Sequence, residues 1–186
     1  MRIISGHFKG KKIFLPEDKI TRPLRDIVKE SIFNLLKHTN KFDFKIQNSQ
    51  ILDLFSGSGS FGLECISRGA KKVTFLENYN PVIKTLKTNI LNLNLEKNSI
   101  IVEKDCFDYL DTIKDNTIKY DLIFIDPPFK ENRISILINN IKNKKILKKN
   151  GIIVIHRHKK DNIEINKYLK ILEIRDYGIS KIVFGN

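Results

Sequence analysis

One stretch of the chain joins an apolar run to an acid, two prolines and an aromatic ring. After Leu122 and Ile123 the sequence reads Phe124-Ile125-Asp126-Pro127-Pro128-Phe129. Proline fixes φ and cannot donate to a sheet ladder, so this pattern predicts a stiff corner at the carboxyl end of a strand. Such a corner presents a carboxylate, carbonyl oxygens and an aromatic face. These groups suit the binding of a flat group that carries an amine.

A glycine-rich segment upstream has the spacing of a cofactor-binding loop. It runs Asp53-Leu54-Phe55-Ser56-Gly57-Ser58-Gly59, and Gly62 completes the pattern G-x-G-x-x-G between a predicted strand and a predicted helix. Glycine lets the backbone turn tightly and approach a ligand closely. The segment therefore predicts a site for a nucleotide-like cofactor, although a tight turn that binds nothing has the same spacing.

Three acids stand at the ends of three successive predicted strands. Asp53 precedes the glycines, where a carboxylate can meet the ammonium of an amino acid, a group that NAD lacks. Glu77 ends the next strand and can accept two ribose hydroxyls. Asp105 follows the third strand and can accept an adenine amino hydrogen, although taken alone it is also a typical helix cap. Together the acids favour S-adenosylmethionine over NAD as the cofactor.

The corner and the loop together predict transfer of a methyl group to an amino nitrogen. The lone pair of an exocyclic amine is delocalised into its ring and must be turned toward the methyl–sulfur bond. The Asp126 carboxylate and the Pro127 carbonyl are placed to hold the two amino hydrogens. Phe129 can stack on the base for roughly 1–3 kcal/mol, and alignment supplies most of the rate because the sulfonium already makes the methyl electrophilic. The alternative is a proline turn with a capping aspartate.

Alternating strand and helix patterns from residue 50 onward predict an α/β fold. Strands are expected near 50–55, 72–77, 99–103, 122–125, 151–156, 170–175 and 180–184. Helices are expected near 59–68, 81–93 and 133–147, with a short helix around Phe107 and Leu110 and with Asn80 as the cap before Pro81. Continuous apolar strands between helices indicate a mostly parallel sheet covered on both faces, with an antiparallel hairpin at its end.

The first 45 residues differ from the rest and are expected to form a basic extension. Residues 1–23 hold short apolar pieces around Gly6 and Gly10, typical of a β-hairpin or an extended arm. Pro23 is expected to open a helix, whose apolar stripe is Ile27, Val28, Ser31, Ile32, Leu35 and Leu36. Residues 46–186 are then expected to form the cofactor-binding domain.

The chain is strongly basic, with 34 Lys+Arg, 21 Asp+Glu and a net charge of +13. Only seven of the basic residues are Arg, and abundant Lys can also reflect genome composition. Position is more informative, since residues 1–45 hold 11 basic residues against five acids, and residues 139–160 hold eight and no acid. The candidate contacts to an anionic partner, nucleic acid first, are Arg2, Lys9, Lys11 and Lys12.

Other classes of site and location are disfavoured. No apolar run approaches the roughly 20 residues of a membrane span, and the first residues lack an apolar signal region, so cytoplasmic residence is expected. Cys65 and Cys106 have no metal or disulfide spacing and are expected to be reduced. His156 and His158 would share one face of a strand, but no third metal ligand is evident and no metal is expected. Contact with RNA and a solvated strand end are the other interpretations of this pair.

These motifs resemble the class I S-adenosylmethionine-dependent methyltransferases, and the Asp126 corner resembles the signature of their amino-methylating members. Over about residues 1–155 the chain is similar to a narrower group, the bacterial 16S rRNA (guanine-N2)-methyltransferase family. The matching segments are Ile4-Ser5-Gly6-His7-Phe8-Lys9-Gly10-Lys11-Lys12, Thr21-Arg22-Pro23, Asp26, Val28-Lys29-Glu30-Ser31-Ile32-Phe33-Asn34, Leu52-Asp53-Leu54-Phe55-Ser56-Gly57-Ser58-Gly59 and Ser67-Arg68-Gly69-Ala70. The chain departs from that family at Leu24, at Ile27 and after the fifth strand, where the family tends toward an acid and this chain reads Ile155-His156-Arg157-His158.

The resemblance implies a Rossmann-like sheet of seven strands and methylation of one guanine N2 in small-subunit rRNA, within an assembling ribosomal particle. It implies cofactor contacts from Asp53, Phe55, Gly57, Ser58, Gly59, Glu77, Asn78, Asp105 and Cys106. It implies that the guanine is held by Asp126, Pro127, Pro128 and Phe129, and that Arg22 lies near the mouth of the site, facing RNA or cofactor. Arg22 thereby joins Arg2, Lys9, Lys11 and Lys12, which the charge pattern indicates, as an expected RNA contact. The size of one domain favours a monomer.

Several other functions remain open on the sequence alone. An amino-methyltransferase acting on DNA adenine or cytosine would share the chemistry, but such enzymes usually add a target-recognition segment and none fits between residues 130 and 150. A protein glutamine methyltransferase usually carries Asn where Asp126 stands. An NAD-dependent oxidoreductase would require a substrate domain. A non-catalytic RNA-binding module would not need the intact corner at Asp126.

Overall fold

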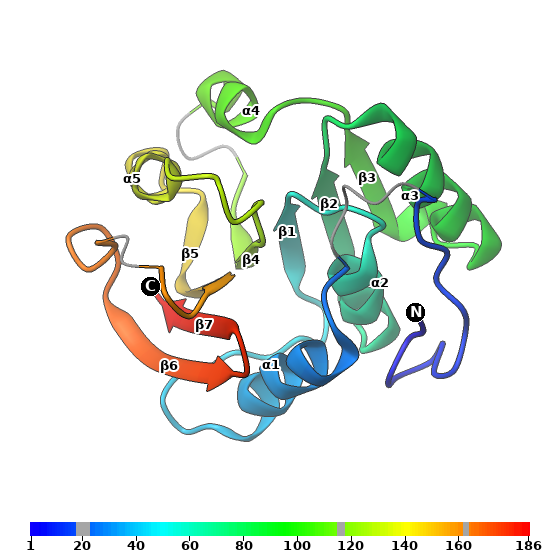
Figure 1. Cartoon of the computed structure of the whole chain (residues 1–186), viewed down its shortest axis with the longest axis horizontal. Coiled ribbons are helices and arrows are strands. Elements are labelled where there is room, and N and C mark those ends of the chain that lie inside the picture. The colour runs from blue at the N-terminus through cyan, green and yellow to red at the C-terminus, as the bar shows by residue number, and fades with distance from the viewer. Residues whose placement is uncertain (18–22, 115–117, 162–163) are drawn as a thin grey trace.

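Seven strands form one sheet in the order β3-β2-β1-β4-β5-β7-β6 (Figure 1). The strands are β1 (Gln50–Leu54), β2 (Lys72–Leu76), β3 (Ser99–Val102), β4 (Tyr120–Ile125), β5 (Leu147–His158), β6 (Ile171–Tyr177) and β7 (Ser180–Gly185). The computed structural model describes residues 1–17, 23–114, 118–161 and 164–186. Strands β1 to β5 are parallel, and β7 runs antiparallel between β5 and β6. The predicted α/β sheet with an antiparallel hairpin is confirmed.

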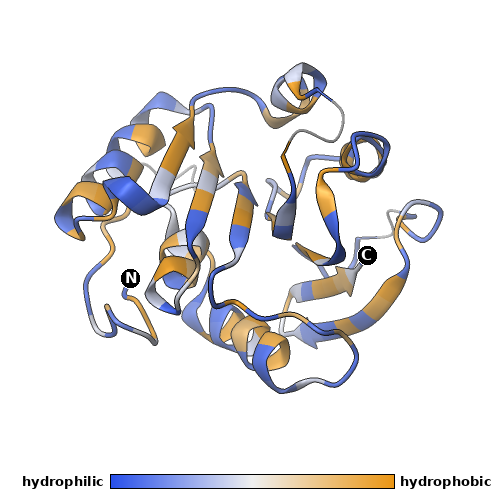
Figure 2. Ribbon diagram, turned by 180° about the vertical axis from the view of Figure 1, so that it is seen from behind, coloured by the Kyte–Doolittle hydropathy of each residue, from blue (hydrophilic) through white to orange (hydrophobic). Residues whose placement is uncertain are grey.

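Helices cover both faces of the sheet. They are α1 (Asp26–His38), α2 (Ser60–Ser67), α3 (Asn80–Asn92), α4 (Cys106–Thr112) and α5 (Ile134–Asn143), with a 3₁₀ turn at Glu96–Asn98. Because side chains alternate across a strand, Ile51 and Phe124 pack with α1, α2 and α3, whereas Leu52 and Ile125 pack with α4 and α5. Figure 2 shows hydrophobic residues on the strands and in stripes on the helices. Within the described residues, no helix has the length and apolar character needed to cross a membrane.

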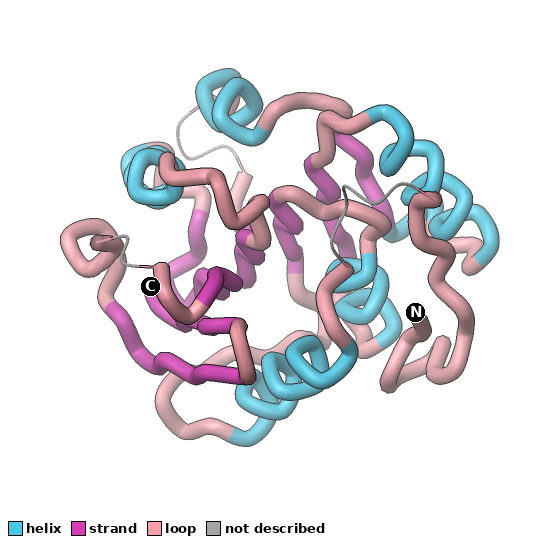
Figure 3. Tube along the Cα trace, viewed as in Figure 1, coloured by secondary structure: helices cyan, strands magenta, loops and turns pink. Residues whose placement is uncertain are grey.

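The strand order reverses at the β1–β4 pair, since β2 and β3 extend the sheet on one side and β5 on the other. In open α/β sheets, ligands bind beyond the carboxyl ends of the strands at such a point. Leu54 of β1 pairs in register with Ile125 of β4, so the segments after the two strands leave the sheet side by side. Figure 3 shows that both segments are loops. The topology therefore brings the two predicted site segments together.

Residues 1–17 pack onto α2 and share the core of α1. Ile3 and Ile13 are almost fully buried in that core. Arg2 and Lys12 form one antiparallel bridge, so the expected N-terminal hairpin is reduced to a single pair of bridging residues. The division of the chain at residue 45 stays a prediction.

The start of α1 differs from the expectation. The helix begins at Asp26 rather than at Pro23, and Ile27 is 65% exposed instead of facing the core. Lys29 takes an inward position and is fully buried. The predicted stripe was wrong here because apolar spacing cannot reveal that a lysine finds buried oxygen partners.

Two further helix boundaries also differ. Asn80 is the first residue of α3 rather than its cap, and Tyr79 occupies the N-cap position without a capping side chain. The Glu77 carboxylate accepts the backbone N–H groups of Asn78 and Tyr79 instead, at 2.9 and 3.1 Å. The helix expected to reach residue 147 ends at Asn143, and β5 starts at 147.

Candidate active site

The glycine loop between β1 and α2 needs its glycines for both backbone and packing. Phe55, Gly57 and Gly59 have φ of 60°, 55° and 82°, a left-handed region that favours glycine. A Cβ on Gly59 would lie 2.5 Å from a Leu86 methyl carbon, and a Cβ on Gly62 would lie 2.2 Å from the Phe75 ring. The loop therefore holds a tight turn and lets α2 lie close against β2.

Asp53 lies beneath this loop and is 1% exposed. Its Oδ2 accepts the Gly62 backbone N–H at 3.0 Å, in the first turn of α2. Burial raises the pKa of the Asp53 carboxyl well above its ordinary value, although the Gly62 hydrogen bond opposes this, and the nearby carboxylates of Asp126 and Glu77 raise that pKa further. The Asp53 carboxyl is thus a buried group that two neighbouring carboxylates influence.

Hydrogen bonds connect the ends of β2 and β3 to the glycine loop. They are made by the side chains of Glu77, Asn78 and Asp105. Glu77 Oε2 accepts the Gly57 backbone N–H at 2.8 Å. The Asn78 amide donates to Asp105 Oδ2 at 3.3 Å. Asp105 Oδ1 accepts the Phe107 N–H at 2.8 Å, so Asp105 is the N-cap of α4. Asp105 therefore has the capping role that was the alternative interpretation of this residue. Its other carboxylate oxygen accepts the hydrogen bond from Asn78.

Cys106 follows this cap as a buried, neutral group. Burial, and secondly the Asp105 carboxylate, raise the pKa of the Cys106 thiol to about 12. The thiol is therefore protonated at neutral pH, so Cys106 packs as a small apolar side chain and does not act as a nucleophile. Both cysteines are free and buried.

The Asp126 corner is fixed by side chains from β5. Asp126 Oδ1 lies 2.8 Å from His156 Nδ1. The Arg157 guanidinium donates to the carbonyl oxygens of Pro128 and Phe129, each at 3.2 Å, and also pairs with Asp161. The Phe129 ring stands edge-on to His156, with centroids 6.2 Å apart. Two neighbouring residues of β5 thus hold the backbone and the Asp126 side chain of this corner.

The Pro127 carbonyl contrasts with the two that follow it. Within the described residues, no group donates a hydrogen bond to the Pro127 oxygen, whereas Pro128 accepts from Glu131 N–H at 2.9 Å and from Arg157. Asp126 itself keeps 14% of its side chain exposed. The Asp126 carboxylate is therefore partly exposed at the sheet edge, whereas Pro127 is buried, and the pairing of its carbonyl with that carboxylate stays a prediction.

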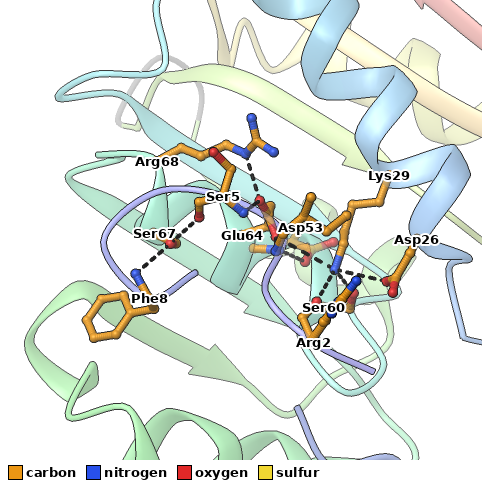
Figure 4. Close-up of polar contacts among 12 residues, drawn as sticks. Arg2, Ser5, Phe8, Asp26, Lys29, Asp53, Ser60, Glu64, Ser67 and Arg68 are labelled. Carbon is orange, nitrogen blue, oxygen red and sulfur yellow. Dashed lines mark hydrogen bonds and ion pairs between the residues drawn. The ribbon is translucent and has the colours of Figure 1, made fainter. Parts of the chain in front are cut away.

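A buried polar cluster holds the N-terminal segment beside the site (Figure 4). Glu64 of α2 accepts the backbone N–H groups of Ile4 and Ser5 at 2.7 and 2.9 Å, and Arg68 Nε at 2.8 Å. Lys29 Nζ lies 3.7 Å from Glu64 and donates to Ser60 Oγ at 3.1 Å, where α2 begins. The same helix therefore carries the cofactor loop at its start and anchors residues 4 and 5.

The comparisons with known proteins agree with this geometry. The whole chain, residues 1–186, matches the model of a family described as Conserved hypothetical protein 95. The chain belongs to this family. A relative named Ribosomal RNA small subunit methyltransferase D, from Buchnera aphidicola subsp. Acyrthosiphon pisum, is 39% identical over 165 residues, which are 89% of this chain and 82% of the relative. The protein of that name from Haemophilus influenzae is 33% identical over 180 residues, covering 96% and 90%.

Solved structures confirm the fold of this Conserved hypothetical protein 95 family member. The structure of yhhF from Escherichia coli has a TM-score of 0.82 at 26% identity and covers 100% of this chain and 96% of that one. A precorrin-6y C5,15-methyltransferase from Geobacter metallireducens has a TM-score of 0.70, covers 93% of each chain and is 15% identical, so it shows the fold alone. The resemblance noted from sequence and the Rossmann-like methyltransferase fold are both confirmed.

The basic residues of the arm in this family member are exposed, and the arm is tied to the glycine loop at Phe14. Asn89 of α3 connects the two, because its amide donates to the carbonyls of Phe14 and Ser58 at 3.0 and 2.9 Å and accepts the Phe14 N–H. Lys12 Nζ lies 5.2 Å from the Phe14 ring centre. The exposed basic side chains of this arm are Arg2, Lys9, Lys11 and Lys12. Arg22, the fifth predicted RNA contact, lies outside the described residues.

Residues that sequence reasoning missed complete the site. Arg157, Ser180 and Asn89 carry no motif, and each acts through a partner far away in the chain. His156 was interpreted with His158 as a metal pair, an RNA contact or a solvated strand end, whereas its ring is hydrogen-bonded to Asp126. Within the described part of the chain, no group of three or more His, Cys, Asp or Glu could hold a metal ion. The sequence feature that could have pointed to this part of the site is the run of His156, Arg157 and His158 at the end of β5.

Proposed function

We propose that this protein transfers a methyl group from S-adenosylmethionine to the exocyclic N2 of a guanine in small-subunit (16S) rRNA. The observation that carries the proposal is the adjacency of the glycine loop and the Asp126 corner. The Asp126 backbone N–H donates to the Leu54 carbonyl at 3.4 Å, so both segments open at the same edge of the sheet. Relatives named Ribosomal RNA small subunit methyltransferase D support the acceptor class.

The residues at the strand ends fit S-adenosylmethionine as the methyl donor. A cationic ligand suits the cluster of carboxyl groups that raises the pKa of Asp53. We expect the methionine part near Asp53 and the loop, the ribose at Glu77, and the adenine between Asp105 and Cys106. The remaining cofactor contacts are then Phe55, Gly57, Ser58, Gly59 and Asn78. When bound, the sulfonium supplies the electrophilic methyl group.

The corner aligns the acceptor in this proposal. The Asp126 carboxylate accepts one amino hydrogen and the Pro127 carbonyl accepts the other, which turns the nitrogen lone pair toward the methyl group. Phe129 and Pro128 flank the base, with stacking on the ring worth roughly 1–3 kcal/mol. As the nitrogen–carbon bond forms, Asp126 takes the proton that the nitrogen loses. Alignment rather than strong base catalysis supplies most of the rate.

The basic arm supports RNA as the acceptor. Its exposed lysines lie on a segment that Asn89 ties to the cofactor loop, so phosphate groups bound there would sit at a fixed distance from the methyl donor. A guanine in a structured RNA must be unpaired or turned out of its stack to reach the corner. We propose that a monomer acts on the small ribosomal subunit while it assembles, in the cytoplasm.

A variant of the corner tests the proposal. Asp126→Ala should lower kcat for methyl transfer to undermethylated small subunits by roughly 10²–10⁴-fold, the range of a positioned proton acceptor. Binding of S-adenosylhomocysteine, followed by calorimetry, should stay within twofold of the wild type. Asp43→Ala removes an exposed acid that lies outside the site and is the matched control.

Two results would contradict the proposal. Near-wild-type turnover by Asp126→Ala would remove the corner from the chemistry. Label transferred to DNA or to a protein glutamine, but to no rRNA, would move the enzyme to one of the other amino-methyltransferase classes.

A further inference from the structure

A continuous chain of three buried or half-buried groups ends at the Asp126 carboxylate. His156 Nδ1 lies 2.8 Å from Asp126 Oδ1, and His156 Nε2 lies 2.8 Å from Ser180 Oγ. His156 and Ser180 are each 2% exposed. Ser180 starts β7, the strand inserted antiparallel beside β5, so the C-terminal hairpin supplies the last member of the chain.

The connectivity is that of a serine hydrolase triad, but the exposure is reversed. In such a triad the serine oxygen faces the substrate and the carboxylate is buried behind the histidine. Here Ser180 is the buried end, whereas the Asp126 side chain is 14% exposed and lies in the candidate active site. Ser180 therefore cannot attack a substrate, and the only end of this chain that can meet one is the carboxylate.

The hydrogen-bond partners determine which nitrogen of His156 carries the proton. An ionised carboxylate can only accept, so Nδ1 must donate to Asp126. Neutral imidazole then has an acceptor at Nε2, which takes the Ser180 hydroxyl hydrogen. Both ring nitrogens are satisfied in this one tautomer, as is typical of a histidine that orients another functional group.

We propose that His156 is a positioning residue for methyl transfer, which holds the Asp126 carboxylate in the orientation that accepts an amino hydrogen, while Ser180 fixes the ring. The inference rests on the proposed function. During the reaction the nitrogen–methyl bond forms, the methyl–sulfur bond breaks, and the proton lost by the nitrogen passes to Asp126 and then to water. His156 keeps the proton at Nδ1 that it donates to Asp126.

The surroundings of the ring explain why a rigid partner is useful here. Arg157, the next residue along β5, already holds the carbonyls of Pro128 and Phe129. His156 adds a hydrogen bond from β5 to the Asp126 side chain. Together the two residues fix the backbone and the side chain of the corner, and misplacement of a reacting group by about 1 Å can cost roughly 10²-fold in rate.

Two substitutions at His156 separate a donated hydrogen bond from simple core filling. In His156→Asn the side-chain amide nitrogen can occupy the place of Nδ1 and still donate to Asp126. In His156→Leu no donor remains. We expect kcat to fall by roughly 10²-fold in His156→Leu and to stay within about fivefold of wild type in His156→Asn, with KM for the rRNA substrate and the Kd of S-adenosylhomocysteine little changed in both. His38→Leu, at the exposed end of α1, is the control.

Equal kcat in His156→Leu and the wild type would overturn the inference, and so would an equally large loss in both His156 variants when both bind S-adenosylhomocysteine normally. The tautomer is an independent readout on the wild-type protein, which needs neither variant to fold. Nitrogen-15 NMR should show a protonated Nδ1 and an unprotonated Nε2 on His156, and the opposite pattern would also overturn it. Failure of the proposed function would instead appear as no methyl transfer to rRNA by the wild type, with the tautomer unaffected.

Discussion

Removal of the Glu64 carboxylate should be among the most destabilising single changes in this protein. Glu64 is fully buried and accepts three hydrogen bonds, from the backbone of Ile4 and Ser5 and from Arg68. It also faces the buried Lys29 ammonium at 3.7 Å. Glu64→Ala leaves the two backbone donors and Arg68 Nε without this acceptor and removes the charge that faces Lys29.

The magnitude follows from that environment. Each hydrogen bond to a charged group contributes about 1.5–3 kcal/mol, but the carboxylate was itself costly to bury, so the bonds do not simply add. Breaking a buried charge pair by removing one partner costs about 3–5 kcal/mol. For a chain of 186 residues, 1 kcal/mol shifts Tm by about 2–4 °C, so Tm should fall by roughly 6–20 °C.

A second substitution in the same cluster should cost less. Burial lowers the pKa of the Lys29 ammonium, although Glu64 and Asp26 oppose this, so its charge is already disfavoured. Lys29→Met keeps the stem in the core and leaves Glu64 with its three hydrogen bonds. We therefore expect a loss of about 1–3 kcal/mol, the net value of the two hydrogen bonds that Lys29 Nζ donates to the Arg2 carbonyl and to Ser60 Oγ.

Thermal and urea unfolding of the variants measure both effects. Glu30→Ala, which removes an exposed acid on α1 next to Lys29, is the control and should leave Tm within a degree of wild type. The prediction fails if Tm drops by less than about 3 °C in Glu64→Ala, or if Lys29→Met loses more stability than Glu64→Ala.

Two further predictions concern the ligands. Replacing Lys9, Lys11 and Lys12 together by Ala should weaken RNA binding and flatten its dependence on salt, as filter binding from low to high salt would show; an unchanged slope would move the RNA surface elsewhere. Asp53 should link stability to pH, because between 3.8 and its raised pKa the folded state binds more protons than the unfolded state, so stability falls as pH rises. Asp53→Asn should lack this fall in a series of melts and should bind S-adenosylhomocysteine less tightly; equal pH slopes for the two proteins would contradict the account.

Local patterns carried much of the prediction. The corner at Asp126 and the loop at Gly57 and Gly59 depend on neighbours in sequence, because proline and glycine restrict or free their own backbone. Their adjacency also followed from the order of strands, since parallel α/β sheets place ligand sites at the carboxyl edge.

The remaining features depend on contacts between distant segments. Nothing near Ser180 in sequence shows that β7 will lie beside β5 and bring its hydroxyl to His156. In the same way, Lys29 breaks an apolar stripe, and only the presence of Glu64 and Ser60 explains its burial. Sequence periodicity identifies which face of an element is buried, but it does not identify the polar groups that a buried side chain will contact.

Nucleoside analysis of small-subunit rRNA, after incubation with S-adenosylmethionine and the wild-type protein, is the decisive measurement for methylation at guanine N2. Undermethylated small subunits and protein-free 16S rRNA would be compared as acceptors. We expect N2-methylguanosine in at least one of these acceptors, and we expect the Asp126→Ala variant to produce little of it. Methyl groups on another base or position, or no methylation of either acceptor by a protein that binds S-adenosylhomocysteine, would contradict it.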